Sequence, residues 1–218
     1  MRNLDKIEGV SSWYNPRKYV SSAEEDRFVI NYFNNKANGF LLDIGAADGV
    51  TGSNSFRLLN EFDWSGILVE PNPNHKNNLE KLFGNINDIT VCYSAIHNTK
   101  ESLDLFVHDG PWQGHSNIYA FETHLKPPCM HGKVKVKCQN INDILEEFDC
   151  PKNIDYISMD IEKSEHHVLN HWNFDKYNVK LWCLEGNKFA NLMISKGYKL
   201  LNTNGYKIND NNKFWGLI

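Results

Sequence analysis

Two apolar runs of the sequence each carry a carboxylate at or near their end. The carboxylate of the first run also begins a glycine-rich turn. Asp43 lies near the end of the run at residues 40–44, and Asp48 lies inside the turn at residues 43–49. Glu70 closes the next apolar run. Because neighbouring parallel strands end at one edge of a sheet, we expect these side chains to face a common ligand. The pattern predicts a site for a ligand that carries positive charge and hydroxyl groups.

The spacing of the glycines separates two kinds of nucleotide-like ligand. Gly45 and Gly49 let the backbone approach a ligand without a Cβ atom in the way. A dinucleotide site uses G-x-G-x-x-G to meet a pyrophosphate, and Ala47 and Val50 break that spacing here. S-adenosylmethionine (SAM) has no phosphate but carries a sulfonium, an ammonium and a ribose diol, which suit carboxylates. We therefore interpret the turn as a SAM site in which Glu70 accepts both ribose hydroxyls.

Further residues at the same edge complete the predicted cofactor site. Asn54 begins the segment after the turn, Pro71 follows Glu70, and Ser94 and Ala95 end a third apolar run. The predicted site comprises Asp43, Gly45, Ala46, Asp48, Gly49, Asn54, Glu70, Pro71, Ser94, Ala95 and Asp160. The alternative is that the glycines only form a tight turn and that Glu70 is a solvated acid at a helix start.

A second group of acids follows the apolar run at residues 154–159. Asp160 comes directly after this run and Glu162 lies two residues on, at the edge where the sulfonium methyl is expected. A sugar hydroxyl is a poor nucleophile at neutral pH, so it needs a base, or a cation that lowers its pKa. We predict catalytic roles for Asp160, Glu162 and His166. Packing or surface exposure is the alternative for His166.

Oxygen ligands for a metal could gather at this edge too. Glu185 ends the run at residues 179–185, and Asn187 follows it. With Asp160 they could bind Mg²⁺, which takes carboxylate and carbonyl oxygens. Carboxylates are common at the ends of parallel strands, so a polar rim without metal is the favoured interpretation.

The segment at about residues 108–132 is predicted to bind the methyl acceptor. It is polar and aromatic, is punctuated by glycine and proline, and lies between two stretches that alternate like strands. The predicted acceptor-binding residues are Trp112, His115, Ser116, Asn117 and Glu185. Their flat apolar surfaces and hydrogen-bonding groups suit a carbohydrate or small polar acceptor. The alternative is a loop anchored by one tryptophan.

The elements that must position these residues alternate between strands and helices. Apolar runs predict strands at residues 40–44, 66–70, 89–95, 154–160 and 179–185, and amphipathic stretches predict helices at 54–61, 75–83, 165–172 and 190–196. This order is typical of an α/β protein with a doubly wound, Rossmann-like and mostly parallel sheet. Residues 198–201 and 213–217 predict an antiparallel C-terminal hairpin.

The length of 218 residues predicts a single domain, spanning 1–218, with an N-terminal helical extension at 1–38. In that extension the segment Ser21-Ser22-Ala23-Glu24-Glu25 resembles a helix start with a serine cap. The helix that follows should pack on the sheet.

Composition narrows the class of protein. No apolar run approaches the roughly 20 residues of a membrane span, and the first residues lack the features of a signal peptide, so we expect a cytoplasmic protein. The net charge is −4, and lysine alternates with valine in the one basic cluster, which argues against nucleic-acid binding. Five cysteines without CxxC spacing predict free thiols.

The sequence resembles the FkbM family of SAM-dependent methyltransferases over most of its length. The family's D-I-G-A-x-x-G turn is matched at residues 43–49, its S-N-T at 53–55 and its W-x-G-x-x-x-E-P strand at 64–71. The E-D pair of the family is matched by Glu25-Asp26, and its K-I-D-x-E-G-x-E by residues 158–165. Two departures from that last motif matter, because Ser158 replaces a frequent lysine and Lys163 replaces the glycine.

The resemblance implies a class I methyltransferase fold and O-methylation of a sugar, a polysaccharide or a related natural product. Two alternatives stay open. One is a metal-dependent O-methyltransferase of small molecules. The other is a SAM-binding interaction module without catalysis, which Lys163 could signal.

Overall fold

The computed structural model describes residues 2, 4–6, 20–107, 132–208 and 211–218. A central sheet of seven strands runs through the molecule in the order β3-β2-β1-β7-β8-β10-β9. Its strands are β1 (Phe40–Ile44), β2 (Ser65–Val69), β3 (Ile89–Cys92), β7 (Asn153–Met159), β8 (Asn178–Glu185), β9 (Tyr198–Leu200) and β10 (Asn212–Leu217). The five strands from β3 to β8 are parallel, and β10 is antiparallel to both of its neighbours. This is a doubly wound, mostly parallel sheet with an antiparallel C-terminal strand, as predicted.

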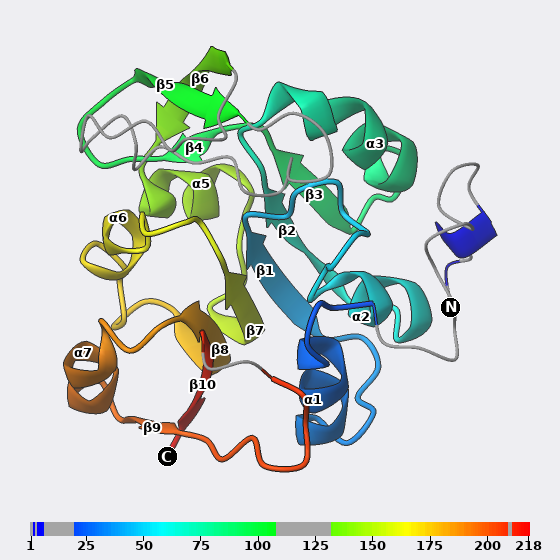
Figure 1. The fold of residues 1–218 in the computed structure, drawn as a ribbon, viewed down its shortest axis with the longest axis vertical. Helices are drawn as coiled ribbons and strands as arrows, with labels where there is room; N and C mark the ends of the chain where they lie inside the picture. The colour runs from blue at the N-terminus through cyan, green and yellow to red at the C-terminus, as the bar shows by residue number, and fades with distance from the viewer. Residues whose placement is uncertain (1, 3, 7–19, 108–131, 209–210) are drawn as a thin grey trace.

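Helices cover both faces of this sheet (Figure 1). One face carries α1 (Glu25–Tyr32), α2 (Phe56–Glu61) and α3 (Pro73–Phe83), and the other carries α5 (Ile141–Glu147), α6 (His166–Leu169) and α7 (Ala190–Ser195). A short 3-10 helix, η1 (Leu4–Lys6), lies near the N-terminus. No helix in the described part of the chain is both long and apolar enough to cross a bilayer.

Two hydrophobic clusters fill the space between the sheet and its helices. Strand residues alternate between them, because successive side chains of a strand point to opposite faces. Leu41 packs with the α1–α3 side, for example, and Leu42 packs with the α5–α7 side. The sheet is therefore buried on both faces, which explains why its strands are near-continuous apolar runs in the sequence.

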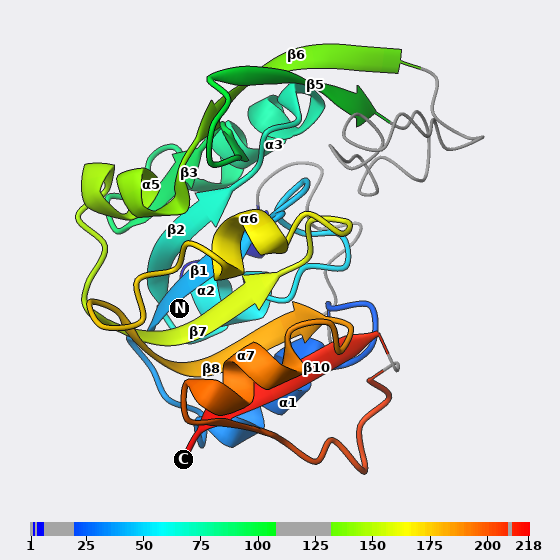
Figure 2. The same cartoon turned by 90° about the vertical axis from the view of Figure 1, so that its left-hand side faces the viewer.

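A second, smaller sheet follows β3 in the chain, and the sequence did not predict which strands form it. It contains β4 (Ala95–Ile96), β5 (Ser102–Val107) and β6 (Gly132–Gln139), in the order β4-β6-β5. The strand predicted at 89–95 is broken at residues 93–94, and its second part leaves the main sheet to pair with β6. The two antiparallel strands β5 and β6 project together from the body of the molecule (Figure 2).

The two ends of the chain follow the predictions with changes in detail. The helix α1 packs its Phe28 and Val29 on the sheet, as expected, but its N-cap is Glu24 in a left-handed conformation rather than a serine. Ser21 instead exchanges hydrogen bonds with Asp26, one turn further along. The C-terminal hairpin is present, and β10 is inserted between β8 and β9. The four cysteines in the described part are buried free thiols: Cys92, Cys138, Cys150 and Cys183.

Candidate active site

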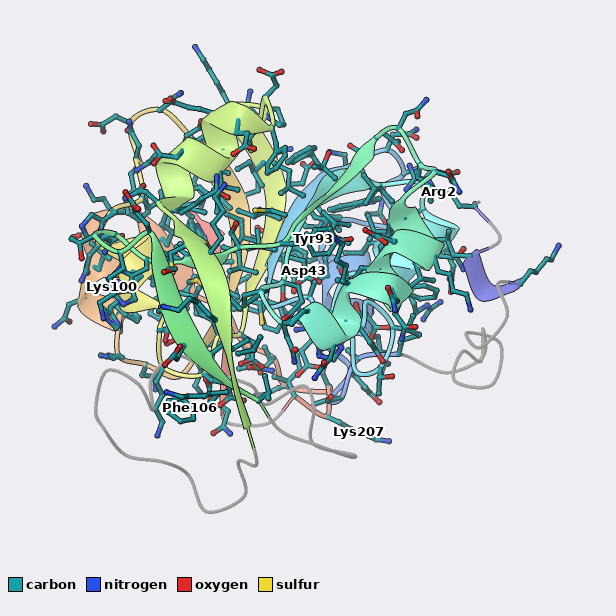
Figure 3. The ribbon with its side chains drawn as sticks, turned by 90° about the horizontal axis from the view of Figure 1, so that it is seen from above. Arg2, Asp43, Tyr93, Lys100, Phe106 and Lys207 are labelled. Carbon is teal, nitrogen blue, oxygen red and sulfur yellow. The ribbon has the colours of Figure 1, made fainter. Side chains whose placement is uncertain are left out.

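The first carboxylate of the site lies inside the molecule, at the end of β1. Asp43 is only 4% exposed, and Figure 3 shows it at the centre of the fold, while Lys207 and Arg2 lie at the periphery. The hydroxyl of Ser55 donates to Asp43 Oδ2. Burial raises the pKa of Asp43 to about 6, and hydrogen bonds from Ser55 and Ser158 oppose that rise. Burial therefore makes this acid easier to protonate than an exposed aspartate, and the two hydroxyls stabilise its ionised form.

Gly45 is required for a reason that the sequence did not suggest. Its φ is +94°, and a Cβ added there would lie 2.0 Å from the carbonyl oxygen of Asp160. Gly49, at φ +82°, would place a Cβ 2.9 Å from side-chain carbons of Leu79 and Phe83. The missing Cβ atoms serve internal packing, so the explanation from ligand approach is incomplete. The turn after β1 and the turn after β7 are in direct backbone contact.

Glu70 joins the ends of two strands. It is 7% exposed, its Oε2 accepts the amide of Ala47 at 2.8 Å, and its Oε1 accepts the amide of Asn72 at 2.7 Å. Burial raises the pKa of Glu70 to about 7; the two amides lower it, and the nearby charges of Asp43 and Asp48 raise it further. Each carboxylate oxygen keeps a lone pair for a ligand. The two amides thus fix the orientation of the carboxylate that is predicted to accept the ribose hydroxyls.

Asp48 has a structural role in addition to its predicted role in cofactor binding. Its Oδ1 accepts the amides of Val50 and Thr51 at 2.9 and 2.7 Å, and its Oδ2 accepts the hydroxyl of Thr51 at 2.6 Å. These bonds hold the turn in shape. Asn54 donates to the hydroxyl of Ser158 at 3.1 Å, which ties the segment after the turn to β7.

The remaining predicted cofactor residues lie along the same edge. Ala46 is buried, and its amide donates to the carbonyl of Val69 at 3.2 Å. Pro71 is half-buried just ahead of α3. Ser94 is buried, and its hydroxyl donates to Gln139 at 2.6 Å, while Ala95 opens β4. The edge from β1 to β4 therefore brings together the segments predicted to hold a cofactor.

The acceptor-side acids are more open. Asp160 directly follows β7 and is exposed, although its backbone amide donates to Ile44 at 3.0 Å. Glu162 is partly exposed and lies at φ +54°. Glu185 ends β8, half-buried, and Asn187 is exposed beyond it. These residues follow neighbouring strands, as predicted.

A comparison with models of protein families identifies the family of this chain. The family described as the methyltransferase FkbM domain matches residues 43–208, which includes both groups of acids. The chain belongs to the FkbM methyltransferase family. It is a SAM-dependent methyltransferase, and the carboxylates at the ends of β1 and β2 stay its predicted cofactor residues.

Solved structures with a similar course of chain include several methyltransferases. An O-methyltransferase from Bacillus cereus in complex with SAH gives a TM-score of 0.48 at 11% identity, over 99% of this chain and 88% of that one. A precorrin-6y C5,15-methyltransferase from Geobacter metallireducens GS-15 gives 0.46 at 11% identity, over 94% and 93%. A putative RNA methyltransferase from Pyrococcus horikoshii gives 0.45 at 12%, over 99% and 95%. A search of curated proteins gave no significant match.

Several predicted residues of this methyltransferase lie outside the described part. They are Trp112, His115, Ser116 and Asn117, all in the segment 108–131. Among the residues that are described, no three His, Cys, Asp or Glu side chains gather closely enough to hold a metal ion. The possible Mg²⁺ site at Asp160, Glu185 and Asn187 therefore gains no support.

His166 belongs to a cluster that sequence reasoning missed. Its ring lies 4.1 Å from that of His167, which in turn lies 4.2 Å from the ring of His97, all measured between centroids. His97 Nδ1 accepts the amides of Thr99 and Lys100 at 3.1 and 3.2 Å, so the proton of the neutral ring sits on Nε2. The adjacency of His166 and His167 was visible in the sequence. The approach of His97, from beyond β4, was not.

Two further residues of the site were missed for different reasons. Ser55 is the last residue of the matched S-N-S segment, and its bond to Asp43 could have been proposed from that motif. Glu165 is buried beneath the turn that carries Asp160, and only the structure shows that its carboxylate faces backbone amides.

Proposed function

We propose that this FkbM-family enzyme is an O-methyltransferase that transfers the SAM methyl group to a hydroxyl of a sugar, a polysaccharide or a related natural product. The observation that carries the proposal is the contact between the two turns. The carbonyl oxygen of Asp160 packs directly against Gly45 in the cofactor turn. An exposed carboxylate is thus positioned beside the predicted place of the sulfonium.

The chemistry follows from that placement. A hydroxyl that attacks the methyl carbon must lose its proton as the new C–O bond forms and the S–CH₃ bond breaks. Asp160 or Glu162 can accept that proton as a general base. SAM leaves as S-adenosylhomocysteine (SAH), with the former bonding pair on sulfur. The buried acids at the ends of β1 and β2 hold the cofactor while the exposed ones meet the acceptor.

The cofactor part is tested by thermal unfolding. SAH should raise the melting temperature of the protein, and Glu70→Ala should abolish that rise because the ribose hydroxyls lose their acceptor. Glu146→Ala is the control and should keep the rise, because Glu146 is exposed on α5 and pairs with Lys176 just before the start of β8. A shift that survives Glu70→Ala would overturn the assignment of the site.

The acceptor part is tested by product analysis. The enzyme is incubated with SAM and a panel of mono- and oligosaccharides, and mass spectrometry locates the added methyl groups. Methylation of a hydroxyl supports the proposal. Transfer only to nitrogen or carbon acceptors in a parallel panel contradicts it.

The two alternatives give distinct results in the same assay. A metal-dependent enzyme loses activity in EDTA and regains it when Mg²⁺ is added. A non-catalytic SAM-binding module shows the SAH-induced thermal shift but produces no SAH from SAM with any acceptor.

A further inference from the structure

The turn after β7 holds two consecutive residues in a conformation that side chains rarely adopt. Glu162 has φ +54° and Lys163 has φ +77°. Neither residue is glycine, so each carries an energetic cost of about 1 kcal/mol or more. Such a conformation persists only where surrounding interactions impose it. The strained turn follows directly on Asp160.

The carboxylate of Glu165 lies against the backbone of this turn. Its Oε1 accepts the amide of Lys163 at 3.1 Å and, more weakly, that of Ile161 at 3.4 Å. Glu165 is 3% exposed, so these bonds are shielded from competing water. Burial raises the pKa of this carboxyl, and the amides of Glu165 itself, Lys163 and Ile161 oppose the rise. The acid is therefore directed at the turn and not at solvent.

The turn is anchored at both ends. At its start the amide of Asp160 donates to the carbonyl of Ile44 at 3.0 Å, and the carbonyl of Asp160 packs on Gly45. At its end the amide of Ser164 donates to the carbonyl of Ile161 at 3.2 Å, above the carboxylate of Glu165. The direction in which Asp160 and Glu162 present their side chains depends on both anchors.

We propose that Glu165 is a positioning residue for methyl transfer. Its carboxylate binds the amides of Ile161 and Lys163 and so holds Glu162 and Lys163 in the left-handed conformation that presents Asp160 and Glu162 to the acceptor. This inference rests on the proposed function, because it assigns the orientation of the proton-accepting side chains to Glu165. Glu165 itself touches neither the reacting hydroxyl nor the methyl group.

The test compares Glu165→Ala with Glu165→Gln. The alanine variant should lower kcat about 10- to 100-fold while the Kd for SAH changes less than about threefold. The glutamine variant retains an oxygen that can accept the amide of Lys163, so it should keep most of the turnover and the same pH profile. If Glu165 were the general base, both variants would lose turnover alike, and the proposal would be wrong.

A second substitution separates positioning from general stability. Lys163→Gly removes the cost of the left-handed conformation, so it should restore a large part of the kcat lost in Glu165→Ala. The control is Asp149→Gly, which relieves another left-handed residue, at φ +48°, on the exposed surface before β7. It should stabilise the protein without restoring kcat. Equal rescue by both glycines, or rescue by neither, would overturn the proposal.

Hydrogen exchange supplies a readout that needs no acceptor. Amides of the peptide spanning residues 160–165 should exchange faster in Glu165→Ala than in the unsubstituted protein or in Glu165→Gln. Unchanged exchange would overturn the proposed contact. A failure of the proposed function looks different, because the unsubstituted protein would then methylate no hydroxyl while the exchange result still held.

Discussion

The predicted cofactor side and the predicted acceptor side of the site are both built from acids at strand ends, yet they are held in different ways. Asp43 and Glu70 are buried, and their oxygens accept specified hydroxyl and amide groups. Asp160 is exposed and Glu162 partly so, and their positions depend on a strained backbone turn. A cofactor that never varies can be met by buried groups fixed in the fold. The acceptor is met by exposed groups whose direction is set by the backbone of the turn that carries them.

The contact that joins the two sides should be the most sensitive to substitution. Gly45→Ala would bring a Cβ to 2.0 Å from the Asp160 carbonyl, so we expect it to cost about 3 kcal/mol or more of unfolding free energy. Gly186→Ala is the matched control, because its φ is +72° and a Cβ there has nothing within 4 Å. It should cost only about 1 kcal/mol in urea unfolding. Equal costs would show that the contact between the turns does not matter.

Removal of a charge on the acceptor side should affect catalysis and spare the cofactor. Asp160→Asn is expected to lower kcat about 100-fold or more while the Kd for SAH stays constant, because the base is lost and the buried site is intact. Glu185→Gln, at the end of the next strand, should mainly raise the KM for the acceptor. Steady-state kinetics and calorimetry distinguish the two. Unchanged turnover in Asp160→Asn would remove Asp160 from its role.

Acidification should act on the cofactor side. The raised pKa values, about 6 for Asp43 and about 7 for Glu70, mean that both acids take up protons as the pH falls through that range. Cationic SAM favours the ionised forms, so its affinity at pH 6 should be about tenfold weaker than at pH 8, with proton release on binding. Calorimetry in buffers of different ionisation enthalpy measures this release. Glu70→Gln should flatten the profile.

The stability of the empty protein should depend on pH in the opposite sense. Since the folded pKa values of these two acids exceed the unfolded ones, the folded state binds more protons between about pH 4 and 7. Their contribution therefore favours the folded state at low pH and is lost as the pH rises through about 6 to 7. Urea unfolding of Glu70→Gln should show a weaker decline over this range. A steeper decline would contradict the assignment.

The smallest expected effect decides between two roles of Asp48. Asp48→Ala removes the acceptor of the amides of Val50 and Thr51, so it should cost about 1 kcal/mol of unfolding free energy. Asp48→Asn keeps an oxygen for those amides and should restore the stability. If Asp48 only shapes the turn, the SAH affinity of Asp48→Asn equals that of the unsubstituted protein. A loss of affinity without a loss of stability would show that its charge acts on the cofactor.

The placement of Asp43 and Glu70 at the ends of neighbouring strands could be predicted from the sequence. Asp43 and Glu70 are each the last acid of an apolar run, and parallel strands bring such positions together whatever the rest of the chain does. Burial of the sheet on both faces made those runs easy to recognise. The alternation of apolar runs and amphipathic stretches predicted the parallel strands at the centre of the sheet. The last two runs predicted the antiparallel C-terminal hairpin.

Other features depend on contacts that no local pattern encodes. The break between β3 and β4 arises because β4 pairs with β6, where Ala95 lies opposite Cys138, 43 residues further along the chain. The helix α5 was missed although Asn140 caps it and Ile141, Ile144 and Leu145 share one face. The helix has only seven residues and begins almost directly after β6, so its apolar spacing was not recognised in the sequence. The support of the acceptor-side turn by Glu165 is a tertiary contact with backbone and leaves no spacing signal.

The position of β10 has a consequence for the edge of the sheet. Although β10 follows β9 in the chain, it lies between β8 and β9 and pairs with both. Without β10, strand β9 would have no partner in this sheet and the edge of β8 would be open to pairing with other chains. Phe214 and Trp215 of this strand belong to the two core clusters, one to each. Local unfolding of β10 is therefore expected to expose both core clusters and an aggregation-prone strand edge at the same time.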